Sequence, residues 1–492
     1  MNRKYRIVVF VLLAALVVPG LGIGPAAADD DPRIRAYQEQ LDRMQKEMDE
    51  MRSKLRALEA ERQPAGQKKT TSAAAPAPAT AAPQAATAPP QAAGALATAA
   101  EQDRKIGVLA TELERLKSAL VLPANKELKS AYGFGPAAAK VYQLDHGLSI
   151  GGYGEFNFRN PVSDKNGERS RFDVARFVLY TGYKFTDRII LNSELEVEHA
   201  VVAGDTEGEI EVEFLTLDFL AWQPLNFRTG LILVPMGFLN EIHEPPFFHG
   251  VFRPEVEERI IPTTWRAGGI GIFGTLLPGL EYRAYALNGM EASGFSNTGT
   301  SGGKQEGSFA LANDFAGTGR VDYTPFAGGL IGASLFAGNS GQSDRFAGST
   351  PSVFTLLWET HAQLRWRGLE LRALGAFTHI RDADLVSEEL EDTIAKDQYG
   401  FYVEGAYDVL PLVMPDTTQY LAPFFRYENL DTQDAVPRGF ARVPGNSIQL
   451  YTVGLDYKPH PQVVLKFEYR NFNADRERRS ADEINLGAGF VF

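Results

Sequence analysis

The chain has 492 residues, a net charge of −13 and no cysteine. The acidic excess argues against nucleic-acid binding, and the absence of cysteine excludes disulfides and thiolate metal sites. The order of apolar and polar residues along the chain is therefore the main indication of the class of protein.

The first 28 residues have the pattern of a bacterial export signal. The basic start MNRKYR precedes the apolar run Ile7–Val18, and the small residues Ala26–Ala28 suit a cleavage site. The apolar run is shorter than the roughly 20 residues that a membrane-spanning helix needs. We therefore predict a cleaved signal peptide over residues 1–28.

Two stretches with coiled-coil spacing follow the signal. In the first, apolar residues alternate at spacings of three and four, at Ile34, Tyr37, Leu41, Met44, Met48, Met51, Leu55 and Leu58. One helix packed on a globular core is the alternative, but no core-forming sequence adjoins it. The spacing predicts a coiled coil, and hence a partner chain, over residues 29–62. An Ala/Pro-rich linker (63–100), a short second coiled-coil segment (101–122) and another linker (123–146) complete this region.

From Gly147 onward, helical spacing gives way to short segments of alternating polarity that are rich in aromatic and branched residues. We count sixteen candidate strands, which begin near Leu148, Phe172, Arg188, Ile210, Asn226, Gly269, Leu280, Gly317, Leu330, Val353, Leu369, Asp397, Gln419, Ile448, Gln462 and Asp482. Short and long connections alternate between them. This alternation is expected of a transmembrane barrel with tight periplasmic turns and long outer loops.

The two faces of each candidate strand differ in polarity. Between residues 354 and 367, one face holds Phe354, Leu356, Trp358, Thr360, Ala362, Leu364 and Trp366, and the other holds Glu359, His361, Gln363, Arg365 and Arg367. A soluble sandwich would show this alternation too. The even strand count, the unequal loops and the export signal favour a membrane, where only a closed sheet satisfies every backbone group. We predict an all-β protein, a sixteen-stranded antiparallel transmembrane β-barrel over residues 147–492.

The chain ends inside the last candidate strand, on INLGAGFVF. Such an ending is explained if this strand closes the ring against the first one. Phe490 and Phe492 are then expected on the lipid face at the periplasmic interface, within an aromatic girdle. We predict that these two side chains take part in membrane insertion.

The stretch NFRTGLILVPMGFLNEIHEPPFFHGVFRPEVEERIIPTTWRAGGIGIFG resembles the phosphate-selective porin O/P family of outer-membrane porins. So does FDVARFVLYTGYKFTDRIILNSELEVEHA, and the resemblance extends over residues 147–492. It implies a sixteen-stranded, homotrimeric porin of the cell outer membrane, with the N-terminal segment in the periplasm.

One property departs from the phosphate-binding members of that family. From Gly147 onward there are 23 Arg and 6 Lys against 46 Asp and Glu. Phosphate capture needs converging Arg or Lys donors, so this acidic excess argues against a phosphate-specific filter. It predicts weak selectivity that leans toward cations.

The longest connection, Val234–Gly268, is expected to fold into the barrel and narrow it. Mixed charge at a narrow point sets ion selectivity, and the candidate constriction residues are Glu241, His243, Glu244, Arg253, Glu255, Glu257, Glu258, Arg259 and Arg266. An ordinary outer loop is the alternative. The spacing of Glu241, His243, Glu244 and His249 matches no standard zinc pattern, so we predict no metal site and no cofactor.

Charged residues at alternate strand positions are candidates for the wall of the lumen. They cannot face lipid, and they comprise Arg176, Glu194, Glu196, Glu198, Glu209, Glu211, Glu213, Arg365, Arg367, Arg372, Lys466 and Arg470. For the glutamates, solvated strand ends are the alternative. Opposed acidic and basic walls would set up a transverse field across the pore.

These features predict a non-enzymatic porin for passive diffusion of small hydrophilic solutes or ions. No Ser/His/Asp arrangement stands out within a pair of strands. The alternative is a barrel scaffold that anchors the outer membrane to peptidoglycan or sheathes a periplasmic or electron-transfer partner. The expected contacts are two further copies of the chain, outer-membrane lipid and lipopolysaccharide, and a peptidoglycan or periplasmic partner at the coiled coil.

Overall fold

The computed structural model describes residues 129–163, 167–204, 206–474 and 480–492. The expected signal peptide, both coiled-coil segments and the Ala/Pro-rich linker lie outside the described residues. Within the described ranges, no helix combines the length and the apolar character that a membrane span requires.

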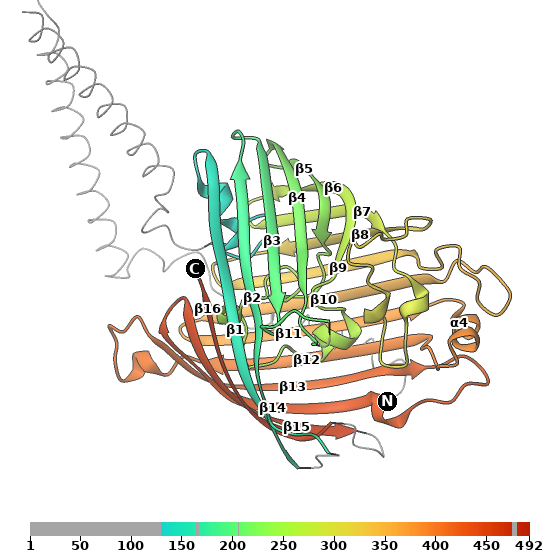
Figure 1. The fold of residues 1–492 in the computed structure, drawn as a ribbon. Helices are drawn as coiled ribbons and strands as arrows, with labels where there is room; N and C mark the ends of the chain where they lie inside the picture. The colour runs from blue at the N-terminus through green and yellow to red at the C-terminus, as the bar shows by residue number, and fades with distance from the viewer. Residues whose placement is uncertain (1–128, 164–166, 205, 475–479) are drawn as a thin grey trace, which may run out of the picture. The chain divides into compact units, whose positions relative to one another are not determined.

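Sixteen strands form one closed antiparallel barrel (Figure 1), as the sequence predicts. The strands are β1 (Gly147–Ser163), β2 (Arg171–Lys184), β3 (Ile189–Glu198), β4 (Ile210–Trp222), β5 (Leu225–Leu233), β6 (Arg266–Leu277), β7 (Leu280–Asn288), β8 (Phe315–Tyr323), β9 (Gly329–Asn339), β10 (Phe354–Trp366), β11 (Leu369–Ile380), β12 (Asp397–Tyr407), β13 (Tyr420–Ala435), β14 (Ser447–His460), β15 (Val463–Ala474) and β16 (Asp482–Val491). Each begins within three residues of its predicted start.

The few helical turns lie before the first strand and in the connections. They are η1 (Ala138–Gln143), η2 (Pro245–Phe247), η3 (Val256–Ile260), η4 (Ala292–Gly294), η5 (Ser301–Gly303), α4 (Ala383–Leu390), η6 (Leu410–Leu412) and η7 (Pro444–Asn446). Among them, η1 and η3 matter most here, because both pack against the barrel wall.

The ring closes between the first and last strands. Tyr153 pairs with Val491 and Arg159 pairs with Asn485. The backbone N–H of Phe492 donates to the Gly152 carbonyl at 2.8 Å, and the Gly152 N–H donates back at 3.1 Å. In Figure 1, β1 and β16 accordingly lie side by side. The last strand therefore has no free edge on either side.

The connections alternate in length around most of the barrel, and most of the short ones are tight turns; residues 408–419, between β12 and β13, are the exception. Between β10 and β11 only Arg367 and Gly368 intervene, with φ of 49° and 86°. Positive φ at both central residues is the two-residue hairpin geometry that glycine favours. Arg367 is exposed in this turn. Its predicted place in the lumen wall is therefore wrong.

The outer surface of the strands is apolar and their inner surface is polar. Large exposed side chains alternate with buried charged ones, as Leu195 does with Glu194 and Glu196. The terminal Phe492 is 38% exposed and its ring stacks on that of Phe490. This polarity is the reverse of that of a soluble protein and suits a barrel in hydrocarbon.

Residues 129–146, predicted as part of an irregular linker, pack inside the barrel; we call them the lumen segment. η1 contacts β1, β2 and β3. The Asn192 amide donates to the Ala138 carbonyl at 3.1 Å, and the Tyr142 hydroxyl donates to Asp218 at 2.6 Å. Phe134 is buried under the Arg228 guanidinium, 4.2 Å from the ring centroid. The lumen segment thus covers the β1–β5 wall near the end with the short turns.

Candidate functional site

The connection between β5 and β6, residues 234–265, also lies inside the barrel; we call it the inner loop. The inward path was predicted, and its apolar residues explain why the loop is stable there. They form a buried cluster with the wall, which includes Val234, Met236, Val256, Ile260 and Trp265. The Trp265 and Phe336 rings lie 4.5 Å apart, centroid to centroid. Burying these groups against the wall removes apolar surface from water.

Carboxylates of the wall hold the inner loop through its backbone N–H groups. Glu468 on β15 accepts from the Val251 N–H at 2.9 Å, and Glu428 on β13 accepts from the Val256 N–H at 3.2 Å. A loop enclosed in a barrel cannot rely on water for all its N–H groups. Strand carboxylates take that role.

Basic residues of the wall bind the carbonyl groups of the same loop. Arg372 donates to the Phe247 carbonyl at 2.8 Å, and Lys466 donates to the Phe248 carbonyl at 3.0 Å. The Lys466 ammonium also lies 3.6 Å from the centroid of the Phe248 ring. The two predicted wall cations therefore support the loop as well as lining the barrel.

Glu241 is the centre of a buried charge network between the inner loop and the wall. The Arg283 guanidinium lies 3.1 Å from the Glu241 carboxylate, and that of Arg320 lies 3.9 Å from it. Both arginines also pair with Asp322, at 2.6 and 2.8 Å. The charges of Arg283 and Arg320 are thus matched by two carboxylates.

A polar cavity of about 260 Å³ lies beside this network, between the inner loop, the lumen segment and the wall. Its charged lining consists of four arginines and three carboxylates, namely Arg283, Arg320, Arg365, Arg372, Glu241, Glu281 and Asp322. Arg365 pairs at 3.1 Å with Glu370, which does not line the cavity. Within the described residues Arg372 forms no ion pair. Of the four arginines, Arg372 is therefore the one whose charge no carboxylate of the described residues pairs with.

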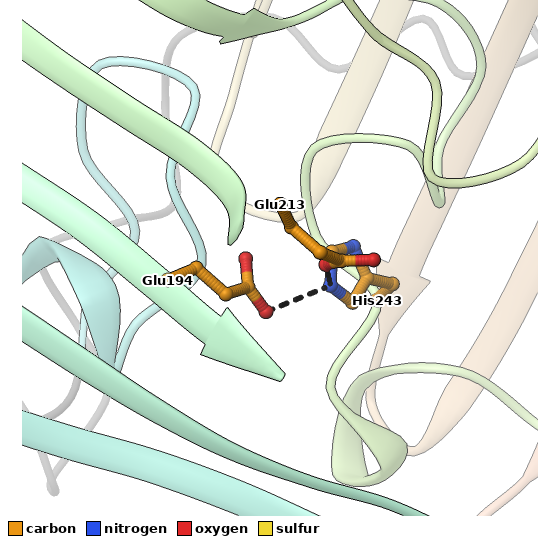
Figure 2. A group of neighbouring side chains, drawn as sticks. All are labelled: Glu194, Glu213 and His243. Atoms are coloured by element: carbon orange, nitrogen blue, oxygen red, sulfur yellow. Dashed lines mark ion pairs between the residues drawn. The ribbon is translucent and has the colours of Figure 1, made fainter. Parts of the chain in front are cut away.

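His243 extends from the inner loop to the acidic β3–β4 wall. Figure 2 shows its imidazole facing the carboxylates of Glu194 and Glu213. The ring Nε2 lies 3.5 Å from Glu194 and 3.3 Å from Glu213. The neighbouring Glu244 is also buried, with no hydrogen-bond partner at its side-chain oxygens. The structure thus brings His243 and two predicted wall glutamates together.

Glu255 joins the inner loop to the far wall. Its carboxylate lies 2.5 Å from Arg259 in the loop and 2.6 Å from Arg470 on β15. Burial alone would raise the pKa of Glu255, but the two guanidinium groups lower it to about 2. Glu255 therefore stays ionised and holds both arginines.

The remaining predicted constriction residues also belong to the inner loop or adjoin it. Glu257 accepts from the Tyr402 hydroxyl at 2.7 Å, and Arg253 bonds the Thr263 hydroxyl. Arg266, the first residue of β6, pairs with Glu211. Burial, followed by the charge of Glu255, raises the pKa of Glu258 to about 7.

The predicted wall residues divide into those inside the barrel and those at its ends. Arg176 pairs with Glu155, Glu196 and Glu198, at 2.8, 3.2 and 3.6 Å. Glu209 precedes β4 and is exposed. The alternative reading, a solvated strand end, is the correct one for Glu209.

Several charged residues of the lumen were not among the predicted wall or constriction residues. They form buried networks that include Asp218 with Arg228, Asp322 with His361 and Glu359, Glu404 with Arg426 and Glu428, and His249 with Asp456. Their alternate spacing within strands, as in Arg320 and Asp322, was the available signal. The identity of the partners depends on the path of the inner loop, which spacing does not encode.

Comparisons with known proteins give one sequence relative and several barrels of similar structure. No family model matches the chain. An uncharacterized protein of Aquifex aeolicus is 39% identical over 370 residues, which cover 72% of this chain and 82% of that protein. The outer-membrane channel DcaP of Acinetobacter baumannii aligns with 70% of this chain and 97% of its own, at 14% identity and a TM-score of 0.47. Salmonella typhi OmpF, in complex with daunomycin, aligns with 71% and 98%, at 13% identity and a TM-score of 0.48.

Proposed function

Since this chain belongs to the same family as the Aquifex aeolicus protein, whose name states no activity, we propose its function from the barrel itself. The protein is an outer-membrane porin, a water-filled channel for passive diffusion of small hydrophilic solutes or ions. The cavity beside Glu241 carries this proposal, because it leaves space for water between the inner loop, the lumen segment and the wall. The inner loop acts as the constriction; it holds the predicted residues from Glu241 to Arg259, and Arg266 follows it at the start of β6.

Outer-membrane placement is part of the same proposal. The predicted export signal, the apolar outer belt and the aromatic Phe490 and Phe492 at the strand end support it. Membership of the phosphate-selective porin O/P family rests on the stretch from Asn226 to Gly274 and remains our inference. Homotrimeric assembly likewise rests on that resemblance and on the heptads of residues 29–62.

The charges around the cavity favour anions, against the expectation from the whole-barrel count. Many acidic residues of that count are exposed in connections, as Asp384 is, or buried in ion pairs, as Asp218 is with Arg228. At the cavity, Arg372 has no ion-pair partner among the described residues, and Arg365 is half-exposed beside Glu370. Fixed charges at a narrow, partly dehydrated point act more strongly than charges in wide water. We therefore propose a weak anion preference.

Reversal potentials in a planar bilayer under a salt gradient test this selectivity. Arg365→Gln combined with Arg372→Gln should lower the anion-to-cation permeability ratio by about twofold or more, since two charges leave the constriction. Arg381→Gln is the matched control, because Arg381 is exposed in an outer loop and stacks on Phe354. An unchanged ratio in the double variant would place the selective charges elsewhere.

A second function is favoured by how much of the lumen is filled. The lumen segment and the inner loop together contact β1–β5 and β7–β16. A scaffold or sheath would need such a filled interior too. Ion conduction distinguishes the two, since a scaffold barrel conducts nothing. If the purified barrel is silent in a bilayer, the scaffold is the better proposal.

A further inference from the structure

Glu194 on β3, Glu213 on β4 and His243 on the inner loop meet at one buried point (Figure 2). The two glutamates are 0% exposed and His243 is 2% exposed. Their ligating atoms all lie within 4.8 Å of one another. The three side chains come from separate parts of the chain, so sequence spacing gave no indication of this cluster.

None of the side-chain polar atoms in this cluster has a hydrogen-bond partner. This holds for both carboxylate oxygens of Glu194 and of Glu213 and for both ring nitrogens of His243. The distances from His243 Nε2 to the carboxylates, 3.5 and 3.3 Å, exceed the usual 2.7–3.2 Å of an N–H···O bond. Buried polar groups without a partner are costly. Three such side chains that face one another therefore indicate a site that binds a ligand.

The two separations from His243 to the carboxylates match those between ligands of a tetrahedral metal ion. Zn²⁺ binds His nitrogen and carboxylate oxygen at about 2.1 Å, so neighbouring tetrahedral ligands lie about 3.4 Å apart. The observed 3.5 and 3.3 Å are close to that value. One imidazole and two carboxylates form a donor set that suits Zn²⁺ and related divalent ions.

The charge around the cluster favours a cation as the ligand. Within the described residues, His243 is the only ion-pair partner of Glu194 and Glu213. The nearby Arg176 already forms ion pairs with Glu155, Glu196 and Glu198. Carboxylate oxygens of Glu196 and Glu211 also lie within 4.8 Å of Glu213. A divalent ion would offset charge that His243 alone, even when protonated, does not.

We propose that Glu194, Glu213 and His243 bind a divalent transition-metal ion of the Zn²⁺ type. This proposal revises the sequence-based prediction of no metal site. Because His243 belongs to the inner loop and the glutamates to the wall, the bound ion fastens the loop to β3 and β4. The site is thus a structural metal site that holds the constricting loop against the wall.

Metal binding can be measured on the full-length protein, purified in detergent and stripped with a chelator. Calorimetric titration with Zn²⁺ should give one site per chain, and Co²⁺ should give the visible absorption of a tetrahedral complex. Glu194→Gln, Glu213→Gln and His243→Asn should each weaken Zn²⁺ binding by roughly tenfold or more. His379→Asn is the matched control, since it removes an outer His–Asp pair of 2.6 Å.

The outcomes separate a metal site from a protonated histidine between two carboxylates. No Zn²⁺ binding by the stripped protein, or equal binding by the three variants and the control, would overturn the proposal. Heat-modifiable migration on gels verifies that each variant still forms the barrel. Metal content is read without any conductance measurement, so failure here leaves the proposed channel function untouched.

Discussion

Single buried ion pairs hold the inner loop in place, and Glu255 is the clearest of them. Its carboxylate forms ion pairs with both Arg259 and Arg470. Glu255→Gln should destabilise the folded barrel by roughly 3 kcal/mol, because it leaves the buried Arg470 with only Glu483, 3.8 Å away, and removes the partner of the half-buried Arg259. Urea unfolding in lipid vesicles measures this. Asp384→Asn, on the exposed side of α4, should change the unfolding midpoint little, and an equal effect of both variants would contradict the assignment.

Glu258 predicts a pH dependence of loop stability. Its pKa is raised to about 7 by burial and by Glu255, so the folded loop holds a proton that the unfolded chain loses near pH 4.3. The wild type should therefore lose stability as pH rises from about 4.5 to 7, relative to Glu258→Gln. Thermal unfolding of both proteins at pH 5 and pH 8 tests this. A difference between them that does not vary with pH would show that Glu258 is ionised throughout.

At the scale of elements, the lumen segment predicts a measurable obstruction. It is held by Tyr142 on Asp218 and by Phe134 under Arg228. Deleting residues 129–146 should raise single-channel conductance while leaving β1 and the ring closure intact. Tyr142→Phe removes only the hydroxyl, which donates to Asp218 and accepts from Arg228, and should leave the conductance near the wild-type value. Unchanged conductance in the deletion variant would mean that the segment does not narrow the path.

Strands were predictable from the sequence, whereas contacts inside the lumen were not. A strand repeats every two residues, so Glu194 and Leu195 necessarily face opposite sides of the sheet. The inner loop has no such period. Its inward path could be inferred from its length and charge, but not that His243 meets Glu213 or that Glu255 meets Arg470. Arg367 was misplaced because the strand pattern continues by one residue into a turn.

The whole molecule is expected to assemble into an oligomer through its N-terminal region. The heptads of residues 29–62 lie outside the described residues, and the trimer is a proposal. Deleting residues 29–62 should lower the temperature at which the oligomer dissociates on gels, while the barrel remains folded. Deleting the linker residues 63–100 is the control, because it keeps both coiled-coil segments. An oligomer equally resistant in both variants would assign the heptads to partner binding instead.

Single-channel recording on the purified full-length protein in a planar bilayer decides whether this barrel is an open, narrowed channel. An open channel gives discrete conductance steps whose size rises with salt concentration, with a reversal potential that leans toward anions. A correctly folded barrel that inserts into the bilayer and passes no current in any salt would contradict the proposed channel function.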